Sequence, residues 1–150
     1  MRFVIQRVEE ASVSVEGKTV GAIKKGFLVL VGVSETDTEE TADKMMKKAF
    51  HLRIFDDGDG KTNLSLGQVG GELLIISQFT LYANCRKGNR PSFTEAGSAE
   101  HANALYEYIL EHAKEYAERV ESGVFGAHMQ VSLMNDGPFT VVLDSEQLFD

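Results

Sequence analysis

Residues 26–33 constrain the fold more than any other segment, because they are apolar almost without interruption. A strand of this composition has to be covered on both faces, as the central strand of a layered structure is. Other stretches with the composition of strands lie on both sides of it in the sequence. They are residues 2–8, 11–15, 20–23, 53–55 and 73–79. Gly17 predicts a hairpin turn between the second and third of these stretches.

Two longer segments have helical periodicity. Residues 39–52 place apolar side chains on one face and lysines on the other, and Thr38 or Asp37 is the predicted N-cap. Residues 99–120 repeat the pattern, and two closing strands follow at 129–134 and 139–143. Because strands outnumber helices and arrive in groups, we expect an α+β fold in which two main helices cover one side of a largely antiparallel sheet system. The length predicts one domain, residues 1–150.

The net charge of −8 comes from the C-terminal part of the chain. Residues 1–90 carry 13 basic and 12 acidic side chains, whereas residues 91–150 carry 2 basic and 11 acidic ones. Proteins that bind duplex nucleic acid in general are basic overall, so we expect no DNA partner. Clusters of basic residues at 24–25, 44–48 and 86–90 still allow a local phosphate site.

Membrane and disulfide-rich classes are excluded by features that the sequence lacks. No apolar run approaches the ~20 residues of a membrane span. Residues 1–7 enter strand-like alternation without the apolar core of a signal peptide. Cys85 is the sole cysteine, which excludes an intrachain disulfide framework. We therefore expect a reduced, cytoplasmic protein with no membrane partner.

The sequence contains no pattern typical of a metal or cofactor site. Its four histidines form no pair with the spacing of metal ligands: His51, His101, His112 and His128. The acidic stretch 56–60 lacks the glutamate of a calcium loop, since Gly67 stands at the twelfth position. Glycine-rich nucleotide loops and a Gly-x-Ser-x-Gly elbow are also absent from the sequence. We expect no metal, no cofactor and a plain turn at 56–60.

Residues 77–81 break the local pattern, because an apolar strand ends there in hydrogen-bonding side chains. If the strand continues, Ser77 and Phe79 face one side, and Gln78 and Thr80 face the other. Polar groups at the end of a buried strand need partners, or they line a pocket. The alternative interpretation is an ordinary strand end that turns into a loop.

Residues 135–140, Asn-Asp-Gly-Pro-Phe-Thr, form the second break in the pattern. Gly-Pro between two strands is a turn signal, and the sequence alone makes a trans peptide the default. Gly137 has no Cβ, which allows the backbone to approach a ligand closely. The alternative is a plain hairpin turn.

These two segments resemble the motifs of the D-aminoacyl-tRNA deacylase (D-tyrosyl-tRNA deacylase) family: Ser-Gln-Phe-Thr-Leu at 77–81 and Asn-x-Gly-Pro-x-Thr at 135–140. Further likeness at 1–15, 87–93 and 123–129 extends the resemblance over essentially the whole chain. The departures are mild. Phe139 and Met134 stand where smaller aliphatic residues are expected, which would alter packing near the turn. Asn89 stands where a basic residue is common, which would slightly weaken an RNA contact.

The resemblance implies a layered β-β-α fold and a homodimeric editing enzyme. Such an enzyme hydrolyses the ester between a D-amino acid and the terminal ribose of tRNA, also acts on glycyl-tRNA, and rejects the L-form. It implies a cis Gly137-Pro138 bond whose turn reaches into the partner subunit's pocket beside residues 77–81, where it acts as a chiral filter. The expected catalytic residues are Thr80, Ser77 and Gln78. The expected substrate contacts are Phe79, Phe125, Asn135, Gly137, Pro138 and Thr140.

The chemistry of this reaction leaves alternatives open. An aminoacyl ester is labile, so positioning the carbonyl and stabilising the oxyanion are sufficient help. The Thr80 hydroxyl is a candidate nucleophile or hydrogen-bond donor, and the N–H groups near Phe79 and Thr80 are candidate oxyanion donors. The ribose 2′-OH of the substrate is a competing activator. Two other functions are an RNA-end-binding protein without catalysis and a small-molecule esterase that uses Thr80.

Overall fold

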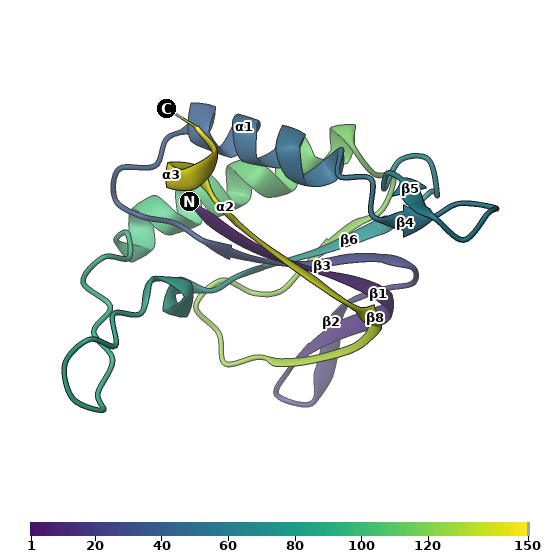
Figure 1. The fold of residues 1–150 in the computed structure, drawn as a ribbon. Helices are drawn as coiled ribbons and strands as arrows, with labels where there is room; N and C mark the ends of the chain where they lie inside the picture. Colours follow the sequence, from purple (N-terminus) through teal and green to yellow (C-terminus); the bar gives the residue numbers. More distant parts are fainter. Residues whose placement is uncertain (150) are drawn as a thin grey trace.

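The structure is a computed structural model that describes residues 1–149. The strands are β1 (Arg2–Val15), β2 (Lys18–Ile23), β3 (Gly26–Gly32), β4 (Phe55–Asp56), β5 (Thr62–Leu64), β6 (Glu72–Ser77), β7 (Val120–Ser122) and β8 (Gln130–Asp144). The α-helices are α1 (Glu39–Phe50), α2 (Ala99–His112) and α3 (Ser145–Leu148), and two short 3₁₀ helices are η1 (Phe79–Tyr82) and η2 (Ala113–Glu115). Helices α1 and α2 lie together on one side of the sheet (Figure 1).

Strand β3 lies at the centre of the sheet, as its apolar sequence predicts. The strand order is β2-β1-β3-β6-β7, and β8 pairs with β1. Phe27 and Val29 pack with the helices, whereas Leu28 packs with a second cluster formed by β1, β2 and β6. The α+β class is therefore confirmed. The sheet is mixed, since β1 forms antiparallel pairs while β3, β6 and β7 run parallel to one another.

Both predicted helices form, with the predicted kind of N-cap on α1 and with their apolar stripes buried. Thr38 caps α1, and its side chain accepts a hydrogen bond from the N–H of Thr41 at 3.2 Å. The apolar stripes of both helices are buried in the main core, with Tyr106 of α2 among the largest fully buried side chains. Helix α1 ends at Phe50, two residues before the predicted end.

The predicted strand breaks in β1 and β8 are wrong, because each forms one long strand. Residues on both sides of the expected breaks pair with the same neighbour, from Arg2↔Asp144 to Ser14↔Gln130. Register shifts between Gln6 and Glu10 absorb the irregular residues without ending the ladder. Polar residues within a strand therefore do not reliably predict its end, because the pairing with a neighbouring strand can continue past them.

Three other boundaries also differ from the prediction. The helix expected over 99–120 ends at His112, and the chain continues as η2 and then as β7. The turn brings Val120 beside Leu73 of β6, so pairing with the sheet ends the helix. The strand expected at 53–55 is β4, Phe55–Asp56. Strand β6 ends at Ser77 instead of residue 79. Within residues 1–149, no helix is long and apolar enough to cross a membrane.

Candidate functional site

A cavity of about 760 Å³ opens at the point where β6 ends. Four consecutive motif residues line it, from Ser77 to Thr80, together with Phe125 from the opposite side. Further lining residues include Phe93, His128 and Met129. Five of the nine predicted site residues thus lie around one space.

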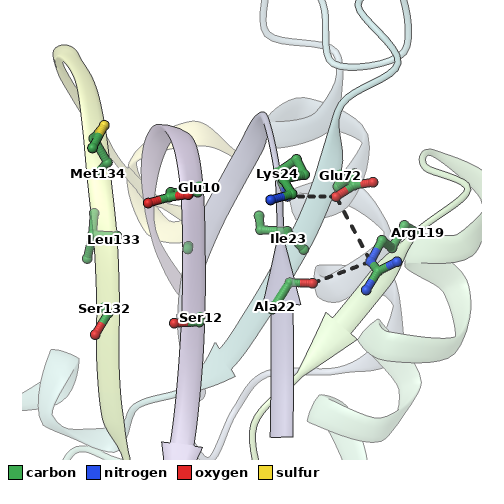
Figure 2. Close-up of a pocket in the computed structure, with 11 residues that line it drawn as sticks. Glu10, Ser12, Ala22, Ile23, Lys24, Glu72, Arg119, Ser132, Leu133 and Met134 are labelled. Atoms are coloured by element: carbon green, nitrogen blue, oxygen red, sulfur yellow. Dashed lines mark hydrogen bonds and ion pairs between the residues drawn. The ribbon is translucent and has the colours of Figure 1, made fainter. Parts of the chain in front are cut away.

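A second cavity, of about 430 Å³, lies between β1, β2 and β8 and contains none of the predicted site residues (Figure 2). Two of its charged side chains, Glu72 and Arg119, are engaged with each other and with the backbone. Glu72 accepts a hydrogen bond from the N–H of Lys24 at 2.7 Å, and Arg119 contacts Glu72 at 4.0 Å. We therefore place the functional site at the larger cavity, where the hydroxyl and amide groups of the motif are gathered.

Of the two interpretations of residues 77–81, the strand end that turns away is confirmed, because the chain enters η1 after Gln78 and the residues do not alternate as a strand. The turn begins with one more sheet-like contact, in which the N–H of Gln78 donates to the carbonyl of Val31 at 2.8 Å. Gly32 then lets η1 lie close to β3. A Cβ atom at this glycine would lie 2.9 Å from the Cβ of Leu81.

The Thr80 hydroxyl is held by its neighbour in the motif. The side-chain amide of Gln78 donates to Thr80 Oγ1 at 2.9 Å. This contact occupies an acceptor position of the hydroxyl and leaves its own hydrogen available to donate. An amide is not a base, so Gln78 does not activate Thr80 as a nucleophile.

The first N–H groups of η1 also face no backbone acceptor. Among the described residues, neither the N–H of Phe79 nor that of Thr80 donates to a backbone carbonyl. Such unpaired groups are usual at the first positions of a helix. Together with the Thr80 hydroxyl, they supply hydrogen-bond donors at one edge of the cavity.

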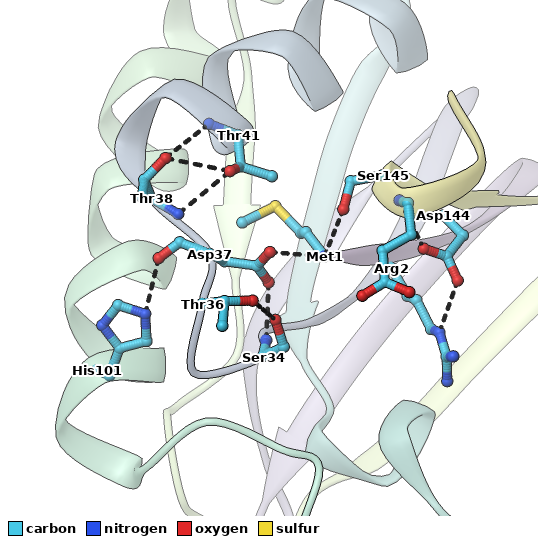
Figure 3. A network of polar contacts seen from close by, with 11 residues as sticks. Met1, Arg2, Ser34, Thr36, Asp37, Thr38, Thr41, His101, Asp144 and Ser145 are labelled. Carbon is cyan, nitrogen blue, oxygen red and sulfur yellow. Dashed lines mark hydrogen bonds and ion pairs between the residues drawn. The ribbon is translucent and has the colours of Figure 1, made fainter. Parts of the chain in front are cut away.

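Arg2 fixes the other end of η1, and sequence reasoning did not identify this role. Its guanidinium donates to the carbonyl of Leu81 at 2.8 Å and to Asp144 at 3.0 Å, and lies 4.5 Å from the ring centre of Tyr82. Burial raises the pKa of Tyr82 above its usual range. Figure 3 shows Arg2 and Asp144 beside the buried contacts of Met1, whose ammonium group donates to Asp37 and Ser145. The start of β1 is thereby tied to the segments that flank the site.

Aromatic side chains form the walls of the cavity. Phe79 is 56% exposed, and Phe93 meets its ring edge-on at 5.0 Å between centroids. Phe125 packs on Tyr106 at 6.1 Å. The Tyr106 hydroxyl donates to the carbonyl of Ile75 at 2.7 Å, and burial raises its pKa to about 12.

The remaining predicted residues lie elsewhere in the same chain. Asn135, Gly137, Pro138 and Thr140 do not line the cavity that contains Thr80 within the described part of the chain. The Gly137-Pro138 bond is cis, as the resemblance implies and against the default from sequence. Both residues are exposed. A single chain therefore separates the two motifs.

The loop around Gly137 is nevertheless firmly held. The side-chain amide of Asn135 faces Gln6 Oε1 at 3.1 Å, Thr140 Oγ1 at 3.1 Å and the carbonyl of Phe139 at 3.3 Å. Its oxygen accepts from the N–H of Phe139 at 2.6 Å. A side chain thus supplies the hydrogen bonds that the sheet ladder does not make at this point.

The buried side chain of Arg7 contacts the loop around Gly137 and holds it in place. Its Nε donates to the carbonyl of Asp136 at 2.9 Å, and its Nη1 donates to the carbonyl of Ile54 at 2.7 Å. The guanidinium also lies 4.7 Å from the ring centre of Phe139. The carboxylates of Asp56 and Asp136 lie 3.6 and 3.5 Å from the same guanidinium. A buried arginine held by backbone carbonyls and carboxylates is a rigid support. The alternation of β1 places Arg7 on the same face as the buried Phe3 and Ile5. It does not show which carbonyl groups the guanidinium meets there.

The acidic stretch 56–60 forms a turn, as predicted. Asp57 accepts hydrogen bonds from the N–H groups of Lys61 and Asp59, at 3.0 and 2.9 Å, and these bonds lower its pKa. Within residues 1–149, no group of three histidine, cysteine or acidic side chains has the geometry to hold a metal ion.

Comparisons with known proteins identify the family. The model of the family described as D-Tyr-tRNA(Tyr) deacylase matches residues 4–144. D-aminoacyl-tRNA deacylases of Thermosipho africanus and Clostridium novyi are each 56% identical over 149 residues, covering 99% of this chain and 100% of theirs. The enzyme of that name from Thermus aquaticus is 53% identical over 147 residues, covering 98% of this chain and 97% of its own.

Two solved structures share the fold. One is described as a c-Myc DNA unwinding element binding protein, with a TM-score of 0.91, 41% identity and coverage of 96% of this chain and 98% of its own. The other is a probable eukaryotic D-amino acid tRNA deacylase, with a TM-score of 0.81, 21% identity and coverage of 95% and 97%. The second shows the fold alone. The family match and the curated relatives show that this chain belongs to the D-Tyr-tRNA(Tyr) deacylase family of enzymes.

Proposed function

We propose that this chain hydrolyses the ester that joins a D-amino acid to the terminal ribose of tRNA, and that the reaction takes place in the cavity at the end of β6. The observation that carries the proposal is the position of the family motif. Gln78, Phe79 and Thr80 gather at one edge of a cavity large enough for an aminoacyl group. The products are free D-amino acid and tRNA.

In this proposal Thr80 acts as a hydrogen-bond donor to the developing oxyanion. Support comes from the side-chain amide of Gln78, which donates a hydrogen bond to the hydroxyl oxygen of Thr80. The hydroxyl hydrogen of Thr80 therefore stays available to the substrate. The N–H groups of Phe79 and Thr80 are further donors to the same oxygen. Water, assisted by the ribose 2′-OH of the substrate, attacks the carbonyl carbon. The C–O bond to the ribose breaks, and the ribose oxygen takes up a proton. Ser77 and Phe125 position the aminoacyl group.

We further propose that the active form is a homodimer. Strand β8 pairs with β1 along one edge, and within residues 1–149 no strand covers its other edge. An open edge of this length is a template for pairing with a second chain. Exposed apolar side chains also follow β8: Val131, Leu133, Met134 and Val142. A second copy that pairs with this edge would cover part of this apolar surface.

The dimer would also unite the two motifs. In the proposed arrangement, Gly137 and Pro138 of one subunit enter the cavity of the other, with Asn135 and Thr140 holding the turn from within. A D-to-L exchange swaps the side chain and the hydrogen on Cα. A rigid backbone wall therefore excludes the L-form without identifying the side chain. Glycine has no side chain to exclude, so glycyl-tRNA is also a substrate.

The proposal includes neither DNA nor a metal. The solved structure at 41% identity is described by its binding to a DNA element, but this chain carries a net charge of −8. An acidic surface opposes general duplex binding. Positioning and hydrogen bonds are sufficient for a labile ester, so no metal or cofactor has a role. A tRNA-editing enzyme acts where tRNA is charged, in the cytoplasm.

The test is an assay on D-tyrosyl-tRNA, L-tyrosyl-tRNA, glycyl-tRNA and D-tyrosine ethyl ester. We expect rapid release of D-tyrosine and glycine from tRNA, and slow or no release of L-tyrosine. Hydrolysis of the ethyl ester as fast as D-tyrosyl-tRNA would indicate a small-molecule esterase. Binding of tRNA without hydrolysis would indicate an RNA-end-binding protein. Equal rates on the D- and L-forms would contradict the chiral filter.

A further inference from the structure

The loop between η1 and α2 carries positive charge on an acidic protein. Its base is closed by Asn84 and Ser92, whose N–H and carbonyl groups pair at 2.7 and 2.9 Å. Its tip, 85–91, contains three basic residues and no acidic one. The loop projects away from the body of the fold as the long teal-green excursion before α2 (Figure 1). Side chains at the tip are exposed.

The arginines of this loop differ from the other arginines of the chain. Arg2, Arg7, Arg53 and Arg119 each donate to carbonyl or carboxyl oxygens of the fold: Leu81, Asp136, Asn63 and Ala22. Among residues 1–149, the side chains of Arg86 and Arg90 have no such partner and no carboxylate within 4.0 Å. A guanidinium has five donors, so these two present their full hydrogen-bonding capacity to solvent.

The base of the loop adjoins the proposed active cavity. Phe93 follows the Asn84–Ser92 pair directly, lines the cavity and packs against Phe79. A tRNA whose terminal nucleotide occupies the cavity would bring its neighbouring nucleotides close to a loop that adjoins this cavity. The preceding nucleotides of a tRNA 3′ end are single-stranded and bring one phosphate each.

We propose that Arg86 and Arg90, assisted by Lys87, bind phosphates of the single-stranded 3′ end of tRNA next to its terminal nucleotide. The inference rests on the proposed function. Guanidinium groups bind phosphate oxygens in a two-pronged geometry, which needs neither a particular base nor a particular amino acid. The loop thereby increases affinity for any tRNA, while the cavity selects the ester. The basic loop also explains how a protein with a negative net charge binds a polyanion.

A competing basic surface exists on α1. Lys44, Lys47, Lys48 and Arg53 line a cavity of about 460 Å³. Lys44 is paired with Glu40, however, and Arg53 with Asn63. Helix α1 also lies in the helical layer, well separated from the projecting loop (Figure 1). The α1 lysines therefore provide a matched control in which two charges are removed from another surface.

The experiment compares Arg86→Gln/Arg90→Gln with Lys47→Gln/Lys48→Gln on two substrates. One is D-tyrosyl-tRNA, and the other is 3′-D-tyrosyl-adenosine, which has the ester but no phosphate. For the loop variant we expect KM for the tRNA to rise on the order of ten- to a hundredfold, with little change on the nucleoside ester. The slope of log affinity against log salt should fall in magnitude by about 1.4, since each phosphate contact on a single strand contributes about 0.7. The α1 variant should change neither the KM for tRNA nor the salt dependence of the affinity.

Three outcomes would overturn the inference. They are an unchanged KM for tRNA in the loop variant, an equal loss on the nucleoside ester, and an equal loss in the α1 variant. Sedimentation of the loop variant as a smaller species would show that the loop contacts a second protein copy instead. If the wild-type protein cleaves neither substrate, the proposed function fails. Filter binding of uncharged tRNA by both variants then tests the loop independently.

Discussion

At the residue scale, the site depends on side chains that hold other groups in place. Gln78 holds the Thr80 hydroxyl, and Arg7 holds the loop that contains Gly137. The residue types of both motifs are visible in the sequence, so their chemistry can be predicted from it. Arg7 and Arg2 cannot be predicted in the same way, because their roles are defined by backbone carbonyls that are distant in sequence.

Replacing the Thr80 hydroxyl tests its role as a donor. We expect Thr80→Val to lower kcat on D-aminoacyl-tRNA by about 10²–10³, the usual cost of losing one oxyanion donor, and to leave KM nearly unchanged. Thr80→Ser retains the hydroxyl and should recover most of the rate. Single-turnover kinetics of both variants provide the measurement. Wild-type turnover by Thr80→Val would exclude the hydroxyl and favour the ribose 2′-OH with backbone donors.

Arg7 tests whether rigidity of the loop determines stereochemical selection. Arg7→Lys keeps the charge but loses at least one of the two bonds to Asp136 and Ile54. Losing a charged hydrogen bond costs about 1.5–3 kcal/mol of stability. We expect the ratio of D- to L-hydrolysis to fall on the order of 10²-fold, because a small displacement of the wall admits the wrong enantiomer. An unchanged ratio in a folded, less stable variant would show that Arg7 has a structural role alone.

At the element scale, the decisive feature is the place where β6 gives way to η1. Periodicity predicts the buried strands and the apolar stripes of the helices, because burial on a regular element repeats along the sequence. It does not predict the end of β6 or the length of α2. These boundaries depend on contacts with β3 and on the pairing of β7 with β6, which no local pattern records.

Gly32 tests how closely η1 must approach β3. A methyl group there would lie 2.9 Å from the Cβ of Leu81, close to the backbone of η1, so the helix would have to move. We expect Gly32→Ala to cost about 1–3 kcal/mol of unfolding free energy and to lower kcat. Gly58→Ala is the control, since nothing lies within 4 Å of a Cβ there, and it should change stability by less than ~0.5 kcal/mol. Equal effects of both substitutions in urea titrations would contradict the close-packing argument.

At the scale of the whole molecule, the two sequence motifs lie apart in one chain, and the proposed dimer would bring them together. The cavity contains the Ser77–Thr80 segment, while Gly137 and Pro138 lie outside it. The open edge of β8 and its exposed apolar side chains suit a second copy. Sequence periodicity cannot detect such an interface, since an exposed strand residue has the same pattern whether solvent or a partner covers it.

A charge on the exposed face of β8 tests the dimer. Val142 is 67% exposed in the single chain. We expect Val142→Lys to give a folded monomer that has lost D-selective hydrolysis, because the second motif no longer reaches the cavity. Val20→Lys, at another exposed valine on β2, should remain dimeric and active. Sedimentation measures the oligomeric state, and hydrolysis of D- and L-tyrosyl-tRNA measures the selectivity. A monomer that still cleaves the D-form selectively would contradict the cross-subunit filter.

The tyrosines set the alkaline limit of stability. All four have a raised pKa: burial is the main cause for Tyr82, Tyr106 and Tyr116, and a hydrogen bond to Asp43 is the main cause for Tyr108. Because the folded pKa lies above the unfolded value of about 10, the unfolded chain loses protons first as the pH rises. The contribution to stability is thus complete below pH ~10 and is lost as the pH rises through the folded pKa values, which are about 12 for Tyr106 and Tyr108.

We expect little phenolate absorbance in the folded protein at pH 10.5, and a steep rise at higher pH that coincides with loss of the circular dichroism signal. The sequence contains no tryptophan, so the tyrosine signal is unobscured. Tyr106→Phe should remove one of the delayed groups. Four tyrosines that ionise reversibly near pH 10 with an unchanged fold would contradict the assigned environments.

The hydrogen bonds of Asn135 have a consequence for how this protein ages. Its side-chain nitrogen faces three oxygen acceptors. A carboxylate in that place would repel the carbonyl oxygen of Phe139, which cannot donate, and would require Gln6 and Thr140 to reorient as donors. Spontaneous deamidation makes this exchange of amide for carboxylate, one molecule at a time, in any stored or long-lived protein. The fold, built on β1 and β8 pairing along their whole length, would survive the change. The turn at Gly137 would lose contacts that hold its shape. If this turn is the proposed chiral filter, an aged molecule would discriminate D- from L-substrates less well while its fold stayed native.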